Sequence, residues 1–200
     1  AAPMFARMPQ DHGLEALLAE SRKQRDACYS AFRNDTQARE LQRLLLRFGI
    51  WMLGSYWQKF AEAGWQARDF AVAYLAELAS PFEQAGEHLE SFDAAKLHAM
   101  RIQAKKLRYC AEFFASLYGK HKSAQYLHPL SEVQEVLGQI NDDAMANRLL
   151  DELLSAPALA GHQETIALGR GWIAHDLAQQ LTVLQEAMRG FQRQRRYWEK

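Results

Sequence analysis

The stretch that decides the fold class reads KLHAMRIQAKKLRY and covers residues 96–109. At about 100° per residue, its apolar side chains fall on one side of a helix and its cations on another. The apolar stripe comprises Met100, Ala104, Leu107, Ala111 and Phe114. Such a stripe packs against a core, so we expect a core helix that starts behind Ser91 or Asp93 and ends near Tyr118 and Gly119.

The other side of this helix is cationic. Along one stripe lie His98, Arg101, Lys105 and Tyr109, with Arg108 on its flank. Residues 96–108 hold five cations, and no acid occurs between Asp93 and Glu112. Like charges four residues apart repel, so a helix built only for stability would interleave glutamates. The pattern indicates a track for a polyanion, in which arginine forms paired hydrogen bonds to phosphate and lysine acts as a point charge.

Two other readings of the cationic stripe stay open. It could be a solvated face, or it could pair with acids of the next helix, because residues 131–164 carry seven acids against the single Arg148. Under the pairing hypothesis, neutralising Glu135, Asp142 and Asp143 destabilises the fold, whereas a polyanion track would then bind its ligand more tightly. The cluster Asn141-Asp142-Asp143 itself suits either a cation or a local network of caps and hydrogen bonds.

The rest of the chain has helical periodicity. Apolar residues recur at spacings of three and four in five further segments, about 14–32, 41–52, 69–89, 128–153 and 164–191. Asn34, Asp35 and Thr36 predict a break after the first, Pro81 a kink in the third, and Pro129 a start of the fourth near His128. No segment alternates apolar and polar residues in the manner of a strand. The sequence therefore predicts an all-α bundle of long antiparallel helices.

Composition narrows the function classes. The 200 residues are 48% apolar, which excludes a disordered chain, and the 24 basic residues balance 24 acidic ones. Balanced charge argues against a uniformly basic nucleic-acid binder. No apolar run is long enough for a membrane span, and the first residues lack a signal-peptide pattern. With Cys28 and Cys110 read as reduced core thiols, we expect a cytoplasmic protein without a membrane partner.

The sequence offers no catalytic motif. It contains no phosphate-binding P-loop, no zinc-protease motif, no nucleophile elbow and no glycine-rich nucleotide fingerprint. The histidines at 121, 128, 162 and 175 are too widely spaced for a local metal site. We therefore expect no catalytic residue, no cofactor and no metal ligand in this chain.

Smaller basic groups occur outside residues 96–109. Secondary candidates for the polyanion site are Arg22, Arg25, Arg39 and Arg43. Taken singly, each is read as a solvated residue or a charge that complements a helix end. Taken together with residues 96–109, they could line one groove.

Two segments resemble the CHAD family, the conserved histidine α-helical domain. Residues 97–109, followed by Glu112-Phe113-Phe114, resemble its signature helix. Residues 130–142, LSEVQEVLGQIND, are similar to its Leu-x-x-x-Gln-x-x-Leu-Gly-x-x-Asn-Asp segment. Looser similarity covers Arg43–Leu46 with Trp51, Gly171-Trp172 and Arg196-Tyr197-Trp198, so that the resemblance spans about residues 14–198.

The resemblance implies two pseudo-symmetric four-helix repeats around a basic groove that binds inorganic polyphosphate. A short internal similarity is consistent with two repeats. A glycine comes shortly before Trp51 and before Trp172, and the two tryptophans lie 121 positions apart. The counterpart of the basic helix would then fall before Ala1, so the first repeat is expected to be incomplete. The expected organisation is a tail at 1–13, the end of the first repeat at 14–68 and the second repeat at 69–198.

The expected function is non-catalytic binding of polyphosphate. The residues expected to bind it are Lys96, His98, Arg101, Lys105, Lys106, Arg108 and Tyr109. Members of the family often follow a CYTH-type triphosphatase domain, and others associate with polyphosphate granules. This chain lacks the Glu-x-Glu-x-Lys strand of a CYTH domain. The alternatives are the accessory C-terminal domain of a CYTH–CHAD inorganic triphosphatase and a helical protein-interaction module.

Overall fold

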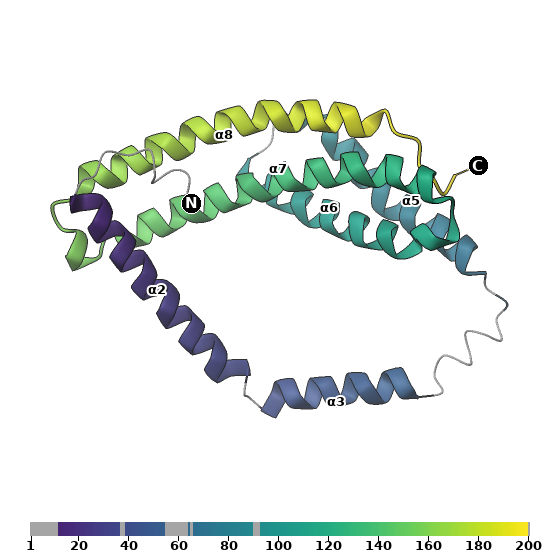
Figure 1. The fold of residues 1–200 in the computed structure, drawn as a ribbon, viewed down its shortest axis with the longest axis horizontal. Coiled ribbons are helices and arrows are strands. Elements are labelled where there is room, and N and C mark those ends of the chain that lie inside the picture. Colours follow the sequence, from purple (N-terminus) through teal and green to yellow (C-terminus); the bar gives the residue numbers. More distant parts are fainter. Residues whose placement is uncertain (1–11, 37–38, 55–63, 65, 90–92, 200) are drawn as a thin grey trace. The chain divides into compact units, whose positions relative to one another are not determined.

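The computed structural model describes residues 12–36, 39–54, 64, 66–89 and 93–199. These residues form six α-helices and two short 3₁₀ helices, and no strand occurs among them (Figure 1). The predicted all-α class is confirmed. None of the described helices combines the length and the apolar character needed to cross a membrane. The chain divides into two compact units, residues 1–65 with 151–166, and residues 66–150 with 167–200.

The first unit contains α2 (His12–Thr36), α3 (Arg39–Leu53) and the 3₁₀ helix η4 (Pro157–Leu159). Its buried side chains are Leu14, Leu17, Leu153, Leu159 and Ile166. Gly13 allows a close approach, because a Cβ at this position would collide with the side chain of Thr165. Since α2 runs to Thr36, the predicted break at residues 34–36 is wrong by a few residues. Cys28 is exposed, so its assignment to a core is also wrong.

The second unit is a helical bundle with one hydrophobic core. It contains α5 (Ala67–Gly86), α6 (Ala94–Phe114), the 3₁₀ helix η3 (Ala115–Leu117), and most of α7 (Lys120–Leu153) and α8 (Gln163–Gln192). The largest wholly buried side chains of this core are Leu75, Phe82, Met100, Leu107, Tyr126, Leu130, Leu137 and Phe191. All four α-helices contribute, so each one buries an apolar stripe of the kind read from the sequence.

Two predicted helix boundaries in this unit are wrong. The helix α7 begins at Lys120, not near His128, and Pro129 lies inside it. Tyr126 and Leu130 are both buried, and their burial outweighs the one hydrogen bond that a proline removes. The helix α5 ends at Gly86 rather than Leu89. A Cβ at Gly86 would collide with Met188, so the absence of a side chain there lets α8 pack closely.

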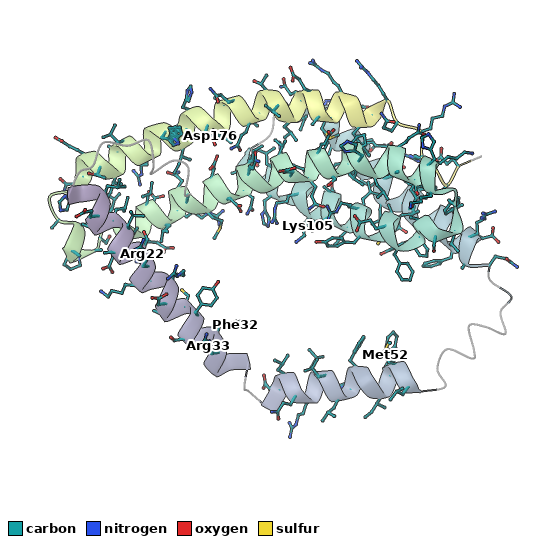
Figure 2. All side chains as sticks on the ribbon, viewed as in Figure 1. Arg22, Phe32, Arg33, Met52, Lys105 and Asp176 are labelled. Atoms are coloured by element: carbon teal, nitrogen blue, oxygen red, sulfur yellow. The ribbon has the colours of Figure 1, made fainter. Side chains whose placement is uncertain are left out.

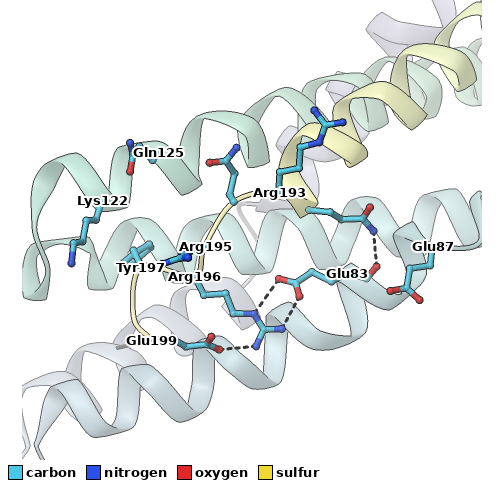
Figure 3. A pocket seen from close by; sticks show the side chains of 11 residues that line it. Glu83, Glu87, Lys122, Gln125, Arg193, Arg195, Arg196, Tyr197 and Glu199 are labelled. Atoms are coloured by element: carbon cyan, nitrogen blue, oxygen red, sulfur yellow. Dashed lines mark hydrogen bonds and ion pairs between the residues drawn. The ribbon is translucent and has the colours of Figure 1, made fainter.

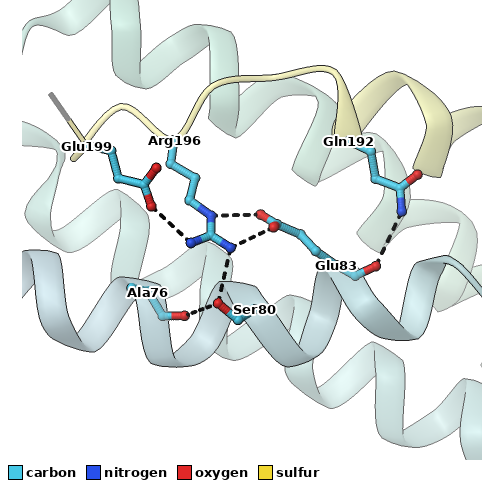
Figure 4. A network of polar contacts seen from close by, with 6 residues as sticks. All are labelled: Ala76, Ser80, Glu83, Gln192, Arg196 and Glu199. Atoms are coloured by element: carbon cyan, nitrogen blue, oxygen red, sulfur yellow. Dashed lines mark hydrogen bonds and ion pairs between the residues drawn. The ribbon is translucent and has the colours of Figure 1, made fainter.

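The C-terminal segment, residues 193–199, folds back onto the bundle. Tyr197 and Trp198 are buried, and the Tyr197 hydroxyl donates to the carbonyl of Ala111 at 2.6 Å. The guanidinium of Arg196 donates to both carboxylate oxygens of Glu83, at 3.2 and 2.7 Å, and to the Ser80 hydroxyl at 3.1 Å (Figure 4). These contacts fix the C-terminal segment against α5.

Candidate functional site

The orientation of α6 is set by its cap and its apolar stripe. The Asp93 side chain caps the helix by accepting from the Lys96 backbone N–H at 2.8 Å. The buried residues of α6 are Leu97, Met100, Ala104, Leu107 and Ala111. The apolar stripe predicted from the sequence is thus confirmed, and the cationic side chains lie away from it. Figure 2 shows one of them, Lys105, on this helix.

Two hydrogen bonds fix the register between α6 and α7. His98 Nδ1 lies 2.8 Å from Asn141 Oδ1, and Arg108 donates to the Ser131 hydroxyl at 3.2 Å. The two bonds are ten residues apart on each helix and run in opposite directions, which is an antiparallel pairing. Interpolation between them places Arg101 opposite Gly138 and Lys105 opposite Gln134.

We name this row of residues the α6–α7 seam. It comprises His98, Arg101, Lys105 and Arg108 on α6, and Ser131, Gln134, Gly138 and Asn141 on α7. A Cβ built on Gly138 meets no atom within 4 Å, so the space opposite Arg101 is open. The Gln134 Oε1 atom is buried without a hydrogen-bond partner among the described residues. The seam therefore combines cationic side chains, open space beside Gly138 and the Gln134 Oε1 acceptor, which makes no hydrogen bond with a described residue.

The cations of the seam differ in the number of contacts that their side chains make. Arg108 lies 3.5 Å from Glu112 and 5.4 Å from the centroid of the Tyr109 ring. Its Nε is nevertheless buried without a hydrogen-bond partner in the described part of the chain. The ammonium of Lys105 lies 6.0 Å from the same ring centroid, within reach of a cation–π attraction.

Three cations of α6 are uncommitted. Within the ranges that the structure describes, Arg101, Lys105 and Lys106 make no hydrogen bond or ion pair through their side chains. Arg101 and Lys105 are half-buried, whereas Lys106, Lys96 and the Tyr109 ring are exposed. Arg101 and Lys105 lie about 40° apart around the helix and share one face, where they are available to a ligand, whereas Lys106 lies about 140° from Arg101.

The acids of α7 do not neutralise these cations. Glu132 lies 3.8 Å from His128 on its own helix, and Asp143 accepts from Gln180 of α8 at 3.0 Å. Across the described residues, no α7 acid forms an ion pair with Arg101, Lys105 or Lys106. The hydrogen bonds of Asn141 and Asp143 match the local-network reading of the cluster at residues 141–143.

Asp143 sits beside a second carboxylate. The Gln180 amide donates to Asp143 and, at 2.6 Å, to Asp176. Burial raises the pKa of Asp143 above its usual value, and the negative charge of Asp176 raises it further. The folded chain therefore binds a proton here more readily than the unfolded chain, and its stability falls as the pH rises through this raised pKa.

We expect Asp143→Asn to raise the melting temperature at pH 7 by about 1–2 °C, because it removes a like-charge contact. The gain should shrink as the pH falls through the raised pKa of Asp143, because the wild-type carboxyl group then becomes protonated. Thermal unfolding followed by circular dichroism from pH 4 to 8 measures this. The exposed neighbour Asp142 provides the control, Asp142→Asn, which should show no such gain. A loss of stability in Asp143→Asn at pH 7 would contradict the assignment.

The secondary candidates lie in the first unit, and the seam is built entirely from the second. Arg22, Arg25 and Arg43 are exposed, and Arg25 pairs with its neighbour Asp26 at 2.8 Å. The side chain of Arg39 lies outside the described residues. Their participation in a shared polyanion site stays a prediction.

Sequence reasoning missed the α7 side of the seam apart from Asn141. Ser131, Gln134, Gly138 and Asn141 recur at spacings of three and four, which is one stripe of a helix. This stripe was visible in the sequence. Its pairing with the cationic stripe of α6 could not be read from the sequence. A polar stripe that contains a glycine looks like any solvated face until the register between the two helices is known.

Comparison with known proteins identifies the family. The family model described as CHAD domain matches residues 2–151, three quarters of the chain, and this range includes both helices of the seam. No curated protein matches the chain. The match ends before α8 begins, so the looser resemblance at Gly171-Trp172 and Arg196-Tyr197-Trp198 stays a prediction. The chain belongs to the CHAD domain family.

Proposed function

We propose that this chain binds inorganic polyphosphate along the α6–α7 seam, without catalysis. The observation that carries the proposal is the pair of uncommitted cations in the seam, Arg101 and Lys105. A stable helix face would pair such charges with acids of its own or of a neighbour. The family association supports phosphate as the anion, since the CHAD resemblance implies polyphosphate binding or a triphosphatase partner.

The spacing of the cations suits a linear polyanion. Residues four apart on a helix are separated by about 6 Å along its axis, so Arg101 and Lys105 present charges one turn apart. Arg108 follows on the flank, where its Nε lies 3.5 Å from Glu112 Oε1 and makes no hydrogen bond with a described residue. Contacts to successive phosphates release condensed counterions, so the affinity should fall steeply with salt.

His98 lies at one end of the seam, where its imidazole ring can accept or donate a hydrogen bond. Since Asn141 Oδ1 is an acceptor, His98 Nδ1 carries the hydrogen in their 2.8 Å contact. The opposite nitrogen, Nε2, accepts when the ring is neutral and donates when it is protonated. We propose that Nε2 of the protonated ring donates to a phosphate oxygen.

Gly138 gives a test of the site that leaves the cations unchanged. We expect Gly138→Glu to weaken binding of a polyphosphate of defined length about tenfold, because it places a carboxylate opposite Arg101. Gly138→Ala should bind as the wild type does. Neither variant should lose stability, since alanine and glutamate favour a helix more than glycine does. Isothermal titration calorimetry at low salt measures the affinities.

The matched control is Gly171→Glu on α8, where a Cβ likewise meets no atom within 4 Å. It adds the same charge to the same unit away from the seam, and we expect an affinity within twofold of the wild type. Equal weakening by Gly138→Glu and Gly171→Glu would mean that net charge alone governs binding, and would contradict the proposed site.

A further inference from the structure

A second cationic site lies beside the C-terminal segment. A cavity of about 940 Å³ is walled by the end of α5, the start of α7 and residues 192–199 (Figure 3). Both basic and acidic side chains line it, so its ability to hold an anion depends on which charges are already paired.

Arg196 is fully engaged within the wall of this cavity. It binds both carboxylate oxygens of Glu83, and its third nitrogen donates to Glu199 at 3.0 Å. Figure 4 shows this network from close by. The single charge of Arg196 offsets one of the two carboxylates, so the network keeps one negative charge, and it holds the segment that carries the neighbouring arginines.

Three cations remain around the cavity. Lys122, Arg193 and Arg195 are exposed and make no hydrogen bond or ion pair through their side chains with any residue that the structure describes. Glu87 and the remaining negative charge of the Arg196 network oppose them. In Figure 3, Lys122 and Glu87 lie at opposite ends of the cavity. With Arg196, Glu83 and Glu199 included, the lining holds four basic and three acidic side chains, a net excess of one positive charge.

We infer that this C-terminal pocket binds a compact phosphate compound with two or three phosphate groups. Two arginine forks and a lysine provide paired hydrogen bonds and a point charge for its oxygens. The volume is at the upper end of ligand-binding sites, so an organic group can accompany the phosphates. The phosphate chemistry is shared by inorganic triphosphate and by a nucleoside triphosphate.

The pocket is distinct from the α6–α7 seam. At 100° per residue, Lys122 lies about 100–180° around α7 from the four seam residues of that helix, so the two sites lie on different sides of it. Its lining shares no residue with the seam. The inference therefore does not rest on the function proposed above.

The test compares two pairs of substitutions in a chain whose seam is weakened by Arg101→Gln and Lys105→Gln. In this background we expect Arg193→Gln with Arg195→Gln to lower the affinity for tripolyphosphate about tenfold. The matched pair, Arg148→Gln with Arg189→Gln, removes two exposed arginines that do not line the pocket, and should change the affinity less than twofold. Calorimetric titration and a thermal melt of each chain provide the affinity and the check on folding.

A second arm titrates ATP into the same chains. Tighter binding of ATP than of tripolyphosphate, lost with Arg193 and Arg195, identifies a nucleotide as the ligand, and equal binding identifies the phosphate chain alone. Absence of tripolyphosphate binding, or equal losses in both arginine pairs, overturns the inference. Failure of the seam to bind long polyphosphate would leave these results unchanged, so the two proposals fail separately.

Discussion

Reversing two charges on α6, by Arg101→Glu together with Lys105→Glu, should lower the affinity for polyphosphate about 30-fold to 1,000-fold. Each reversal replaces a charge-assisted contact by repulsion, worth about 1–2 kcal/mol at a partly exposed site. Neither side chain forms an ion pair with the residues that the structure describes, so the substitutions remove no such contact from the fold. Calorimetry with polyphosphate of one defined length measures the loss, and an unchanged melting curve shows that the fold is retained.

The control for this prediction reverses two exposed arginines outside the seam, Arg148→Glu with Arg189→Glu. It changes the net charge equally and should weaken binding only slightly through long-range repulsion, which salt screens. If both double variants lose affinity alike, binding follows the net charge of the chain and not the seam. Equal affinity of the Arg101→Glu/Lys105→Glu variant and the wild type would remove α6 from the site altogether.

The second large effect concerns stability. We expect Arg196→Met to lower the free energy of unfolding by about 2–3 kcal/mol and the melting temperature by about 5–10 °C. The Arg196 and Glu83 side chains are only 20% and 29% exposed, so removal of the guanidinium leaves a poorly solvated carboxylate without its partner. It also releases the segment that brings Tyr197 and Trp198 into the core. Urea and thermal unfolding measure both quantities.

Arg195→Met is the matched control, because Arg195 is the exposed neighbour of Arg196 and makes no ion pair in the described part of the chain. It should change stability by less than about 0.5 kcal/mol. Glu83→Gln, combined with Arg196→Met in a double-mutant cycle, isolates the coupling between the two side chains. Equal effects of Arg195→Met and Arg196→Met would show that the Glu83 contact does not hold the segment.

Local periodicity was sufficient to predict much of this fold. The buried face of α6 and its cap at Asp93 follow from the spacing of Met100, Ala104 and Leu107 and from one acid before the first turn. The start of α7 did not follow, since Pro129 is a local stop signal and the burial that overrides it is tertiary. Helix boundaries were predicted correctly where the local sequence signal and the packing of the core favour the same boundary.

The α6 side of the candidate site could be predicted from the sequence, and the α7 side could not. The cations of α6 stand out because no acid separates them, whereas Gly138 and Gln134 gain meaning only from the antiparallel register that the His98–Asn141 contact sets. The balanced net charge was also a poor guide to the local charge of α6. The acids of α7 compensate the cations of α6 in number, yet among the described residues they do not pair with Arg101 or Lys105.

The most direct test of the seam is the slope of log affinity for polyphosphate against log salt concentration. We compare the wild type with Arg101→Gln/Lys105→Gln and with Arg148→Gln/Arg189→Gln. If Arg101 and Lys105 each neutralise a phosphate, their loss should make the slope shallower by about 1.4, while the control pair leaves it unchanged. The same slope in all three chains would contradict polyphosphate binding at the α6–α7 seam.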